Sequence, residues 1–237
     1  MGVFRFAATV LFILCIPVAL VTTNIRFMAN EPRVYRYAID EFDAVSTTGI
    51  ERNELIRAGA EIRDYFKNDQ DTLLIEVTED GREVSLFNAR ETVHMQDVKD
   101  RFQLANRVQE FSTMYVLAFI VVVVLWAREI TPRELAVRVA GGSVLCLAVL
   151  GGIGAVGLSG FDQAWSDFHE VIFSNDFWQL NPATDHLIQM FPPDFWESIV
   201  FLVGTMVVAE AALLLLGAGL YLGASRHKQE ALELATA

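Results

Sequence analysis

Two histidines, His94 and His169, are the residues of this sequence best suited to proton transfer. They lie in the two longest polar stretches of the chain, in the segments FNARETVHMQDVK and DFHEVIF. The unperturbed pKa of histidine is the closest of any side chain to neutrality. Arg90, His94, Asp97 and Arg101 follow one another at three- and four-residue steps, which places them on one side of a helix. A carboxylate beside an imidazole orients it and raises its basicity, so this stripe predicts a tuned proton acceptor.

Other roles for these histidines are open at the level of the sequence. His94 could be a structural residue, partly buried and hydrogen-bonded to Glu91 or Asp97, and His169 could be an ordinary histidine of a membrane-surface loop. The pair could also hold a metal, with one of these carboxylates as a third ligand. Their spacing matches no zinc pattern such as H-E-x-x-H, so we expect no metal centre and no cofactor.

The remaining polar groups offer no obvious catalytic side chain. Ser159 lies in GLSG, which is not the G-x-S-x-G turn of a serine hydrolase. His186 follows Asp185 in a turn-like segment and is interpreted as a capping residue, and His227 lies in a basic tail. An enzyme built from this sequence is therefore expected to take its nucleophile from the substrate.

Composition predicts an α-helical membrane protein. Of the 237 residues, 53% are hydrophobic, and a helix needs roughly 17–25 apolar residues to cross a hydrocarbon core of about 30 Å. We expect the first run to remain as an anchor, since no small-x-small cleavage site precedes Asn24. Cys15 and Cys146 lie inside apolar runs, which predicts no disulfide framework. Four transmembrane helices are expected, over residues 3–23, 111–127, 139–158 and 199–222.

The distribution of basic residues predicts the orientation of these helices. Between Gly160 and Trp196 there are six acidic residues and no Lys or Arg, whereas basic residues accompany the other ends of the apolar runs. Both termini are therefore predicted to be cytoplasmic, together with the loop 128–138 and the tail 223–237. The segments 24–110 and 159–198 are then extracytoplasmic, and both contain one of the two histidines.

Residues 24–110 are predicted to form a small α+β domain. One helix is indicated by an apolar face that consists of Leu55, Ala58, Ile62, Tyr65 and Phe66. Two β-rich runs around Asp80-Gly81 then predict a hairpin. Asn88 begins a further helix, with Glu91 as its capping-box partner.

This last helix poses a geometric problem. Its stripe of Glu91, Met95, Val98 and Phe102 is expected to pack under the hairpin, which leaves the stripe of His94 facing a cleft. A straight continuation into the second span would put His94 about 30 Å above Met114, at about 1.5 Å per residue. Chemistry on a lipid therefore predicts a break or reorientation between residues 103 and 112.

The loop at residues 159–198 is predicted to lie in or dip into the membrane interface, because it is rich in aromatic side chains. His169 lies beside an apolar helical face rather than on it. The aromatic residues are Phe161, Trp165, Phe168, Phe173, Phe177, Trp178, Phe191, Phe195 and Trp196.

Two features lie inside the apolar runs. Glu210 is costly in lipid and is expected to face the interior of the helix bundle or a water-filled cavity. Glycines recur every third residue at Gly151, Gly154, Gly157 and Gly160, which predicts a close approach between helices.

Several motifs together resemble a known family. The segment FNARETVHMQDVK, followed by FHEVIF, DFW and DHLIQMFPPDFW, is similar to the bacterial four-span integral membrane family that includes the lipoprotein intramolecular transacylase. The resemblance covers the topology of the chain, and its specific motifs cover residues 85–110 and 161–197. It carries nothing over to residues 24–70.

The resemblance implies a multi-pass protein of the bacterial cytoplasmic membrane with its active site on the extracytoplasmic side. Its reaction moves an acyl chain from the diacylglyceryl group of a lipoprotein to the α-amine of the same lipoprotein's N-terminal cysteine, giving a lyso-form lipoprotein. His94 and His169 match the family's motif histidines, and we favour His94 as the base. The expected partners are this diacylated substrate and membrane lipid, with no nucleic acid. Supporting roles are expected for Arg90, Glu91 and Asp97, and substrate or lipid contacts for Asn88, Trp165, Trp178 and Asp185.

Two other functions remain open from the residues alone. The chain could be a membrane sensor or scaffold that binds a partner through its outer domain, or a metal-dependent lipid hydrolase. A scaffold gives no reason for the two histidines to approach each other. Their separation in the fold therefore discriminates between a scaffold and an enzyme.

Overall fold

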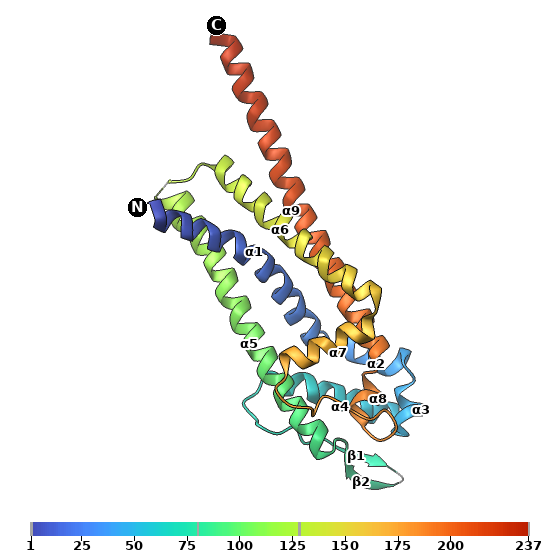
Figure 1. The fold of residues 1–237 in the computed structure, drawn as a ribbon. Helices are drawn as coiled ribbons and strands as arrows, with labels where there is room; N and C mark the ends of the chain where they lie inside the picture. Colours follow the sequence, from blue (N-terminus) through green and yellow to red (C-terminus); the bar gives the residue numbers. More distant parts are fainter. Residues whose placement is uncertain (1, 80, 128, 237) are drawn as a thin grey trace. The chain divides into compact units, whose positions relative to one another are not determined.

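The computed structural model describes residues 2–79, 81–127 and 129–236. These residues are mostly helical, and four of the helices, within Gly2–Asn30, Ala89–Trp126, Pro132–Ser159 and Pro193–His227, are long and apolar enough to cross a membrane. Figure 1 shows the elements in order: α1 (Gly2–Asn30), α2 (Pro32–Glu41), α3 (Ala44–Thr48), α4 (Arg52–Tyr65), β1 (Glu76–Glu79), β2 (Arg82–Ser85), α5 (Ala89–Phe119), the π-helical turn η1 (Ile120–Trp126), α6 (Pro132–Ser159), α7 (Phe161–Ile172), α8 (His186–Met190) and α9 (Pro193–Thr236).

The chain divides into two compact units. The first, which we call the membrane unit, consists of the residues up to Asn24, Arg107–Ala155 and the residues from Val203 onward. The second, the outer unit, consists of Ile25–Asn106 and Val156–Leu202. Both predicted extracytoplasmic segments therefore contribute to the same unit.

Close packing in the membrane unit occurs at Gly142. A Cβ atom on this residue would lie 2.6 Å from Ile16 Cδ1 and 3.1 Å from the Ile13 carbonyl oxygen, so no larger residue fits there. By contrast, a Cβ on Gly151, Gly154 or Gly160 would meet no described atom within 4 Å, and one on Gly157 would only be in ordinary contact with Phe201 Cζ at 3.8 Å. The prediction that the glycine repeat marks the close approach was wrong, because glycine spacing shows where contact is allowed and not which helix comes near.

A polar pair lies among the apolar helices of the same unit. Asn24 Nδ2 donates to Glu210 Oε2 at 2.8 Å, and Asn24 is only 2% exposed. Glu210 thus points toward another helix of the unit, as its cost in lipid predicts.

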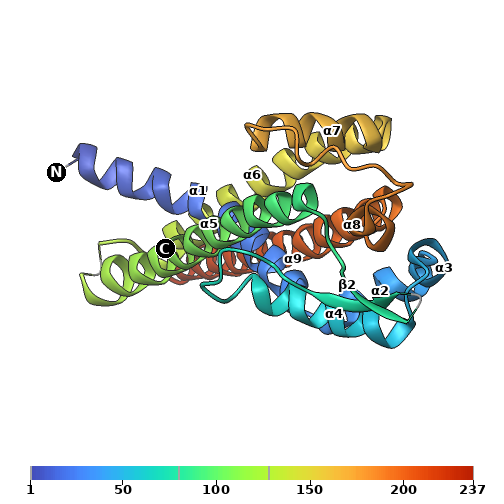
Figure 2. The same cartoon turned by 90° about the horizontal axis from the view of Figure 1, so that it is seen from below.

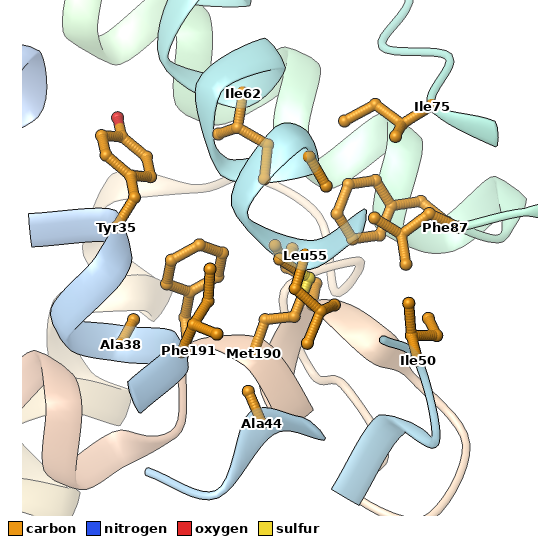
Figure 3. Close-up of a cluster of buried hydrophobic side chains, with 14 of the residues drawn as sticks. Tyr35, Ala38, Ala44, Ile50, Leu55, Ile62, Ile75, Phe87, Met190 and Phe191 are labelled. Carbon is orange, nitrogen blue, oxygen red and sulfur yellow. The ribbon is translucent and has the colours of Figure 1, made fainter. Parts of the chain in front are cut away.

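The outer unit is built around one apolar core, which Figure 3 shows in part. Leu55, Ala58, Ile62 and Tyr65 on α4 are buried, as the helical periodicity predicts. They pack with residues of the hairpin region and with Met190, Phe191 and Phe195 from the second outer segment. Phe191 and Phe195 are 7% and 2% exposed, so their predicted interfacial position was wrong. The aromatic content of this segment serves its core as well as its surface.

The hairpin has the predicted form. β1 and β2 pair antiparallel with Glu76 opposite Ser85 and Glu79 opposite Arg82, and the views in Figures 1 and 2 place them beside α4. Gly81 in the turn has a φ of +77°, which favours glycine. Asp80, the other predicted turn residue, lies outside the described residues.

The predicted break before the second span is wrong. α5 runs without interruption through residues 103–112 and continues into η1. The reason is chemical: between Ala89 and Trp126 the sequence has no glycine or proline, the residues that most often end or kink a helix. The helix that carries His94 therefore continues unbroken into the predicted second span.

One carboxylate connects the two outer segments. Glu91 Oε2 accepts a hydrogen bond from the backbone N–H of Asn88 at 2.8 Å, which confirms the capping box. Its other oxygen, Oε1, accepts from the backbone N–H of Leu187 at 2.6 Å, at the start of α8. Glu91 is 1% exposed, and burial raises its pKa despite these two hydrogen bonds. A single side chain thus caps the first turns of two helices far apart in the sequence.

We expect Glu91→Gln to destabilise the protein by about 2 kcal/mol, because an amide nitrogen would face one of the two backbone donors. For a chain of this size that cost corresponds to a fall in Tm of roughly 4–8 °C, measured by intrinsic fluorescence in detergent. Glu83→Gln on the exposed face of β2 is the matched control and should not change Tm. Equal Tm values for the two variants would show that the Glu91 carboxylate does not hold the segments together.

Candidate active site

The two histidines meet inside the outer unit. His94 on α5 and His169 on α7 have ring centroids 6.1 Å apart and are 7% and 8% exposed. The convergence expected of an enzyme is therefore confirmed. Neither imidazole is open to bulk water, so both act in a medium of low polarity.

Aromatic side chains surround His169. Trp165, Trp178, Phe168 and Phe173 lie with ring centroids 4.7, 5.0, 5.4 and 5.6 Å from its imidazole. Phe173 also lies 5.1 Å from His94 and so touches both histidines. Trp165 and Trp178, expected to contact substrate or lipid, belong to this aromatic cluster.

The tautomer of His169 is set by a backbone contact. Its Nδ1 lies 2.7 Å from the carbonyl oxygen of Trp165, one helical turn earlier. A carbonyl only accepts hydrogen bonds, so Nδ1 carries the proton and the lone pair of a neutral His169 is on Nε2. Burial lowers the pKa of His169, and the bond to Trp165 partly opposes this.

His94 has a different environment. Its Nδ1 is buried and has no hydrogen-bond partner among the described residues. Burial is the main cause that lowers its pKa to about 4, with a contribution from His169, while Asp97 acts in the opposite direction. The prediction that a neighbouring carboxylate raises the basicity of His94 is therefore wrong. Glu91 is bonded to two backbone donors, and Asp97 accepts a hydrogen bond from Asn175 Nδ2 at 2.8 Å.

The predicted supporting residues hold the segment that follows α7. Arg90 Nη1 donates to the carbonyl oxygens of Asp176 and Gln179 at 2.6 and 3.3 Å, and its guanidinium lies 5.6 Å from the centre of the Phe177 ring. Arg90 therefore binds this segment and not Glu91. Because Trp178 lies between the two carbonyls, Arg90 positions a ring that contacts His169.

Asn88 and Asp185, both expected to contact substrate, are bonded to each other. Asn88 Nδ2 donates to Asp185 Oδ1 at 3.0 Å, and Asn88 Oδ1 accepts from the backbone of Arg90 and Glu91. Asp185 also accepts from the backbone N–H of Asn181 at 2.7 Å. Their observed contacts are those of cap and turn residues.

Sequence reasoning gave no site role to Asn175, and it placed Phe173 only among the interfacial aromatic residues. Both lie in an irregular segment, where no helical or strand periodicity assigns side chains to a face. The available signal was their position directly after the helix that carries His169.

Two properties of the surroundings of the histidines limit the chemistry that is possible at this site. Within the described residues, no three His, Cys, Asp or Glu side chains come together in a way that could hold a metal. The histidines are enclosed by aromatic rings, among them Trp165, Phe173 and Trp178. The arrangement places the lone pair of His169 on Nε2, next to a second neutral imidazole whose N–H can donate a hydrogen bond.

We expect Arg90→Ala to loosen the segment at residues 173–180, because two carbonyl oxygens lose their donor. Hydrogen exchange of the backbone amides in this segment should become about tenfold faster, as the loss of about 1.4 kcal/mol of hydrogen bonding implies. Arg101→Ala, which removes an exposed arginine further along the same helix, is the control and should leave exchange there unchanged. The positioning role of Arg90 is wrong if the two variants exchange alike.

Comparison with known proteins places this site in a family. A model of the family described as lipoprotein intramolecular transacylase Lit matches residues 10–196. Comparison with curated proteins gives no match. Among solved structures, the chain is similar to the membrane-integral lipoprotein intramolecular transacylase Lit from Bacillus cereus, with a TM-score of 0.79 at 17% identity, covering 96% of this chain and 100% of that one.

Two further structures of the Bacillus cereus protein carry a mutation that replaces a histidine by arginine or by alanine. Both have a TM-score of 0.74 at 16% identity and cover 96% of this chain. The similarity to these structures supports the fold, and the family model spans most of the chain, including both histidines. The chain therefore belongs to the lipoprotein intramolecular transacylase Lit family.

Proposed function

We propose that this membrane transacylase moves an acyl chain from the diacylglyceryl group of a lipoprotein to the α-amine of that lipoprotein's N-terminal cysteine, with His94 and His169 as its acid–base pair. The observation that carries the proposal is the convergence of two buried histidines at 6.1 Å from separate segments of the chain. A scaffold does not require this juxtaposition.

The chemistry needs no nucleophile from the enzyme. Conversion of an ester to an amide runs downhill, and the attacking amine and the ester belong to the same molecule. Holding them in reacting geometry can lower the barrier by roughly 7–11 kcal/mol. What remains is to remove a proton from nitrogen, to stabilise the oxyanion and to return a proton to the glyceryl oxygen.

We assign the base to His169. Its Nδ1–H is held by the Trp165 carbonyl, so Nε2 has the lone pair that accepts a proton. This reverses the division favoured from the sequence, in which His94 was the base. His94, kept neutral by burial, is then the hydrogen-bond donor to the oxyanion, a role that a neutral imidazole performs well in a site shielded from water.

The reaction passes through a tetrahedral intermediate. The amine nitrogen attacks the ester carbonyl, and a C–N bond forms as the carbonyl oxygen becomes an oxyanion next to His94. His169 Nε2 takes one proton from nitrogen. As the C–O bond to the glyceryl oxygen breaks, the same proton passes from His169 to that oxygen, leaving an amide and a free hydroxyl group.

The substrate would reach this pair from the extracytoplasmic side of the bacterial cytoplasmic membrane, as the distribution of basic residues predicts. Exposed apolar residues adjoin both histidines in sequence: Val93 next to His94, and Phe168 next to His169. These side chains, together with Val171 at 83% exposure, offer a surface for acyl chains.

Mass spectrometry of a lipoprotein N-terminal peptide tests the reaction directly. In a host whose lipoproteins are diacylated, the wild-type chain should convert them to the N-acyl lyso form. His169→Asn keeps a side-chain nitrogen near the position of Nδ1 but loses Nε2, and we expect a fall in rate of about 10²–10⁴-fold. His94→Asn should cost about 10²–10³-fold.

His186→Asn is the matched control, because His186 also has its Nδ1 2.7 Å from a backbone carbonyl, that of Leu86, and lies outside the pair. It should retain activity. Unchanged acyl placement with well-expressed wild-type protein would refute the transacylase assignment, and activity in His169→Asn would refute His169 as the base.

The pH dependence follows from the direction of the pKa shifts. A buried His169 keeps its lone pair to lower pH than an ordinary histidine with a pKa near 6.5. From about pH 7.7 down to 6.5, kcat/KM on a synthetic diacylated lipopeptide should fall about tenfold for each pH unit. This is the fall expected when a single group, here the substrate amine, becomes protonated. The steeper fall that marks protonation of the base should begin below pH 6.5. If the steeper fall in kcat/KM began at pH 6.5 or above, the pKa of the base would not be lowered, and the assignment would be contradicted.

A further inference from the structure

A cavity in the outer unit, away from the histidines, has the chemistry of an anion site. It has a volume of about 270 Å³ and is lined by three arginines, Arg36, Arg52 and Arg63, over apolar side chains that include Ile39 and Ile56. No carboxylate is among its lining residues. In a chain with a formal charge of −12, three guanidinium groups around one cavity are a local reversal of the overall charge.

Two of these arginines are held in place by acids outside the cavity. Arg52 donates from Nε and Nη2 to the two carboxylate oxygens of Asp40 at 2.7 and 2.8 Å. Nε and Nη2 of Arg63 both lie 3.0 Å from Asp64 Oδ1. These pairs leave the Nη1 groups to bind a ligand, with little entropy to lose on binding.

Arg36 has no hydrogen bond and no ion pair within 4 Å among the described residues, and it is exposed. Its charge acts on the carboxylates of Glu31 and Asp40 only at longer range. An unbonded guanidinium next to two fixed ones favours a ligand with several oxygens. A phosphate group fits this pattern, because its oxygens accept the parallel N–H donors of arginine.

We propose that the cavity lined by Arg36, Arg52 and Arg63 binds a phosphate group, carried either by an anionic phospholipid headgroup or by free phosphate. The proposal does not depend on the proposed catalytic roles of the histidines, and loss of lipid binding is measured separately from transacylation.

Native mass spectrometry of the full chain in detergent tests this, with dioleoyl phosphatidylglycerol or dioleoyl phosphatidylcholine added at matched concentration. The wild-type chain should retain the anionic lipid preferentially. Arg36→Gln should weaken its retention about tenfold, the usual effect of losing one charge-assisted hydrogen bond. Because Arg36 has no ion pair to lose, this variant should keep the Tm of the wild type.

Arg33→Gln is the matched control, since Arg33 lies on the same helix, pairs with Glu31 and does not line the cavity. It should retain the anionic lipid as the wild type does. A parallel arm adds inorganic phosphate and measures Tm: stabilisation that is lost in Arg36→Gln, without preference between the lipids, would assign the site to free phosphate. Equal lipid retention in Arg36→Gln and Arg33→Gln, with no effect of phosphate, would overturn the proposal.

Discussion

The buried carboxylate of Glu91 is the interaction on which the outer unit depends. It lies three residues before His94 and accepts backbone hydrogen bonds at the starts of α5 and α8. A buried carboxylate without partners would be costly, but two backbone donors at helix N-termini offset that cost. The same bonds attach the second outer segment to the first, and through it the aromatic cluster to the helix of His94.

Around this connection, polar side chains of α5 position the segment after α7. Arg90 binds its carbonyls, Asp97 binds Asn175, and Asn88 binds Asp185. Each bond is worth only about 1 kcal/mol, but together they order a segment with no regular secondary structure of its own. That segment contributes Phe173 and Trp178 to the surroundings of the histidines.

The histidines show how burial competes with charge. A carboxylate one turn away favours the protonated imidazole, yet the pKa of His94 is lowered because removal from water disfavours its charged form more strongly. Two neutral imidazoles side by side suit acyl transfer between groups of one substrate. In the proposed mechanism the enzyme moves a proton and stabilises an oxyanion but forms no covalent bond to the acyl group.

The sequence predicted features that depend on neighbours within one element. Four apolar helices, the buried face of α4, the hairpin and the capping box of Glu91 all follow from local periodicity and short-range hydrogen bonding. The motif around His94 also led to the correct family. The predicted break in α5 was wrong, and the local sequence already argued against it, because no glycine or proline is present to cause it.

Only the tertiary structure decided which groups meet. His94 and His169 are separated by many residues of sequence, and the second acceptor bond of Glu91 reaches Leu187. The place of the close helix contact, Gly142 and not the glycine repeat, also depends on a partner helix. Periodicity shows which face of an element is apolar but not what covers it. The protonation of His94 and the tautomer of His169 depend on burial and on a specific carbonyl, and both exist only after the chain has folded.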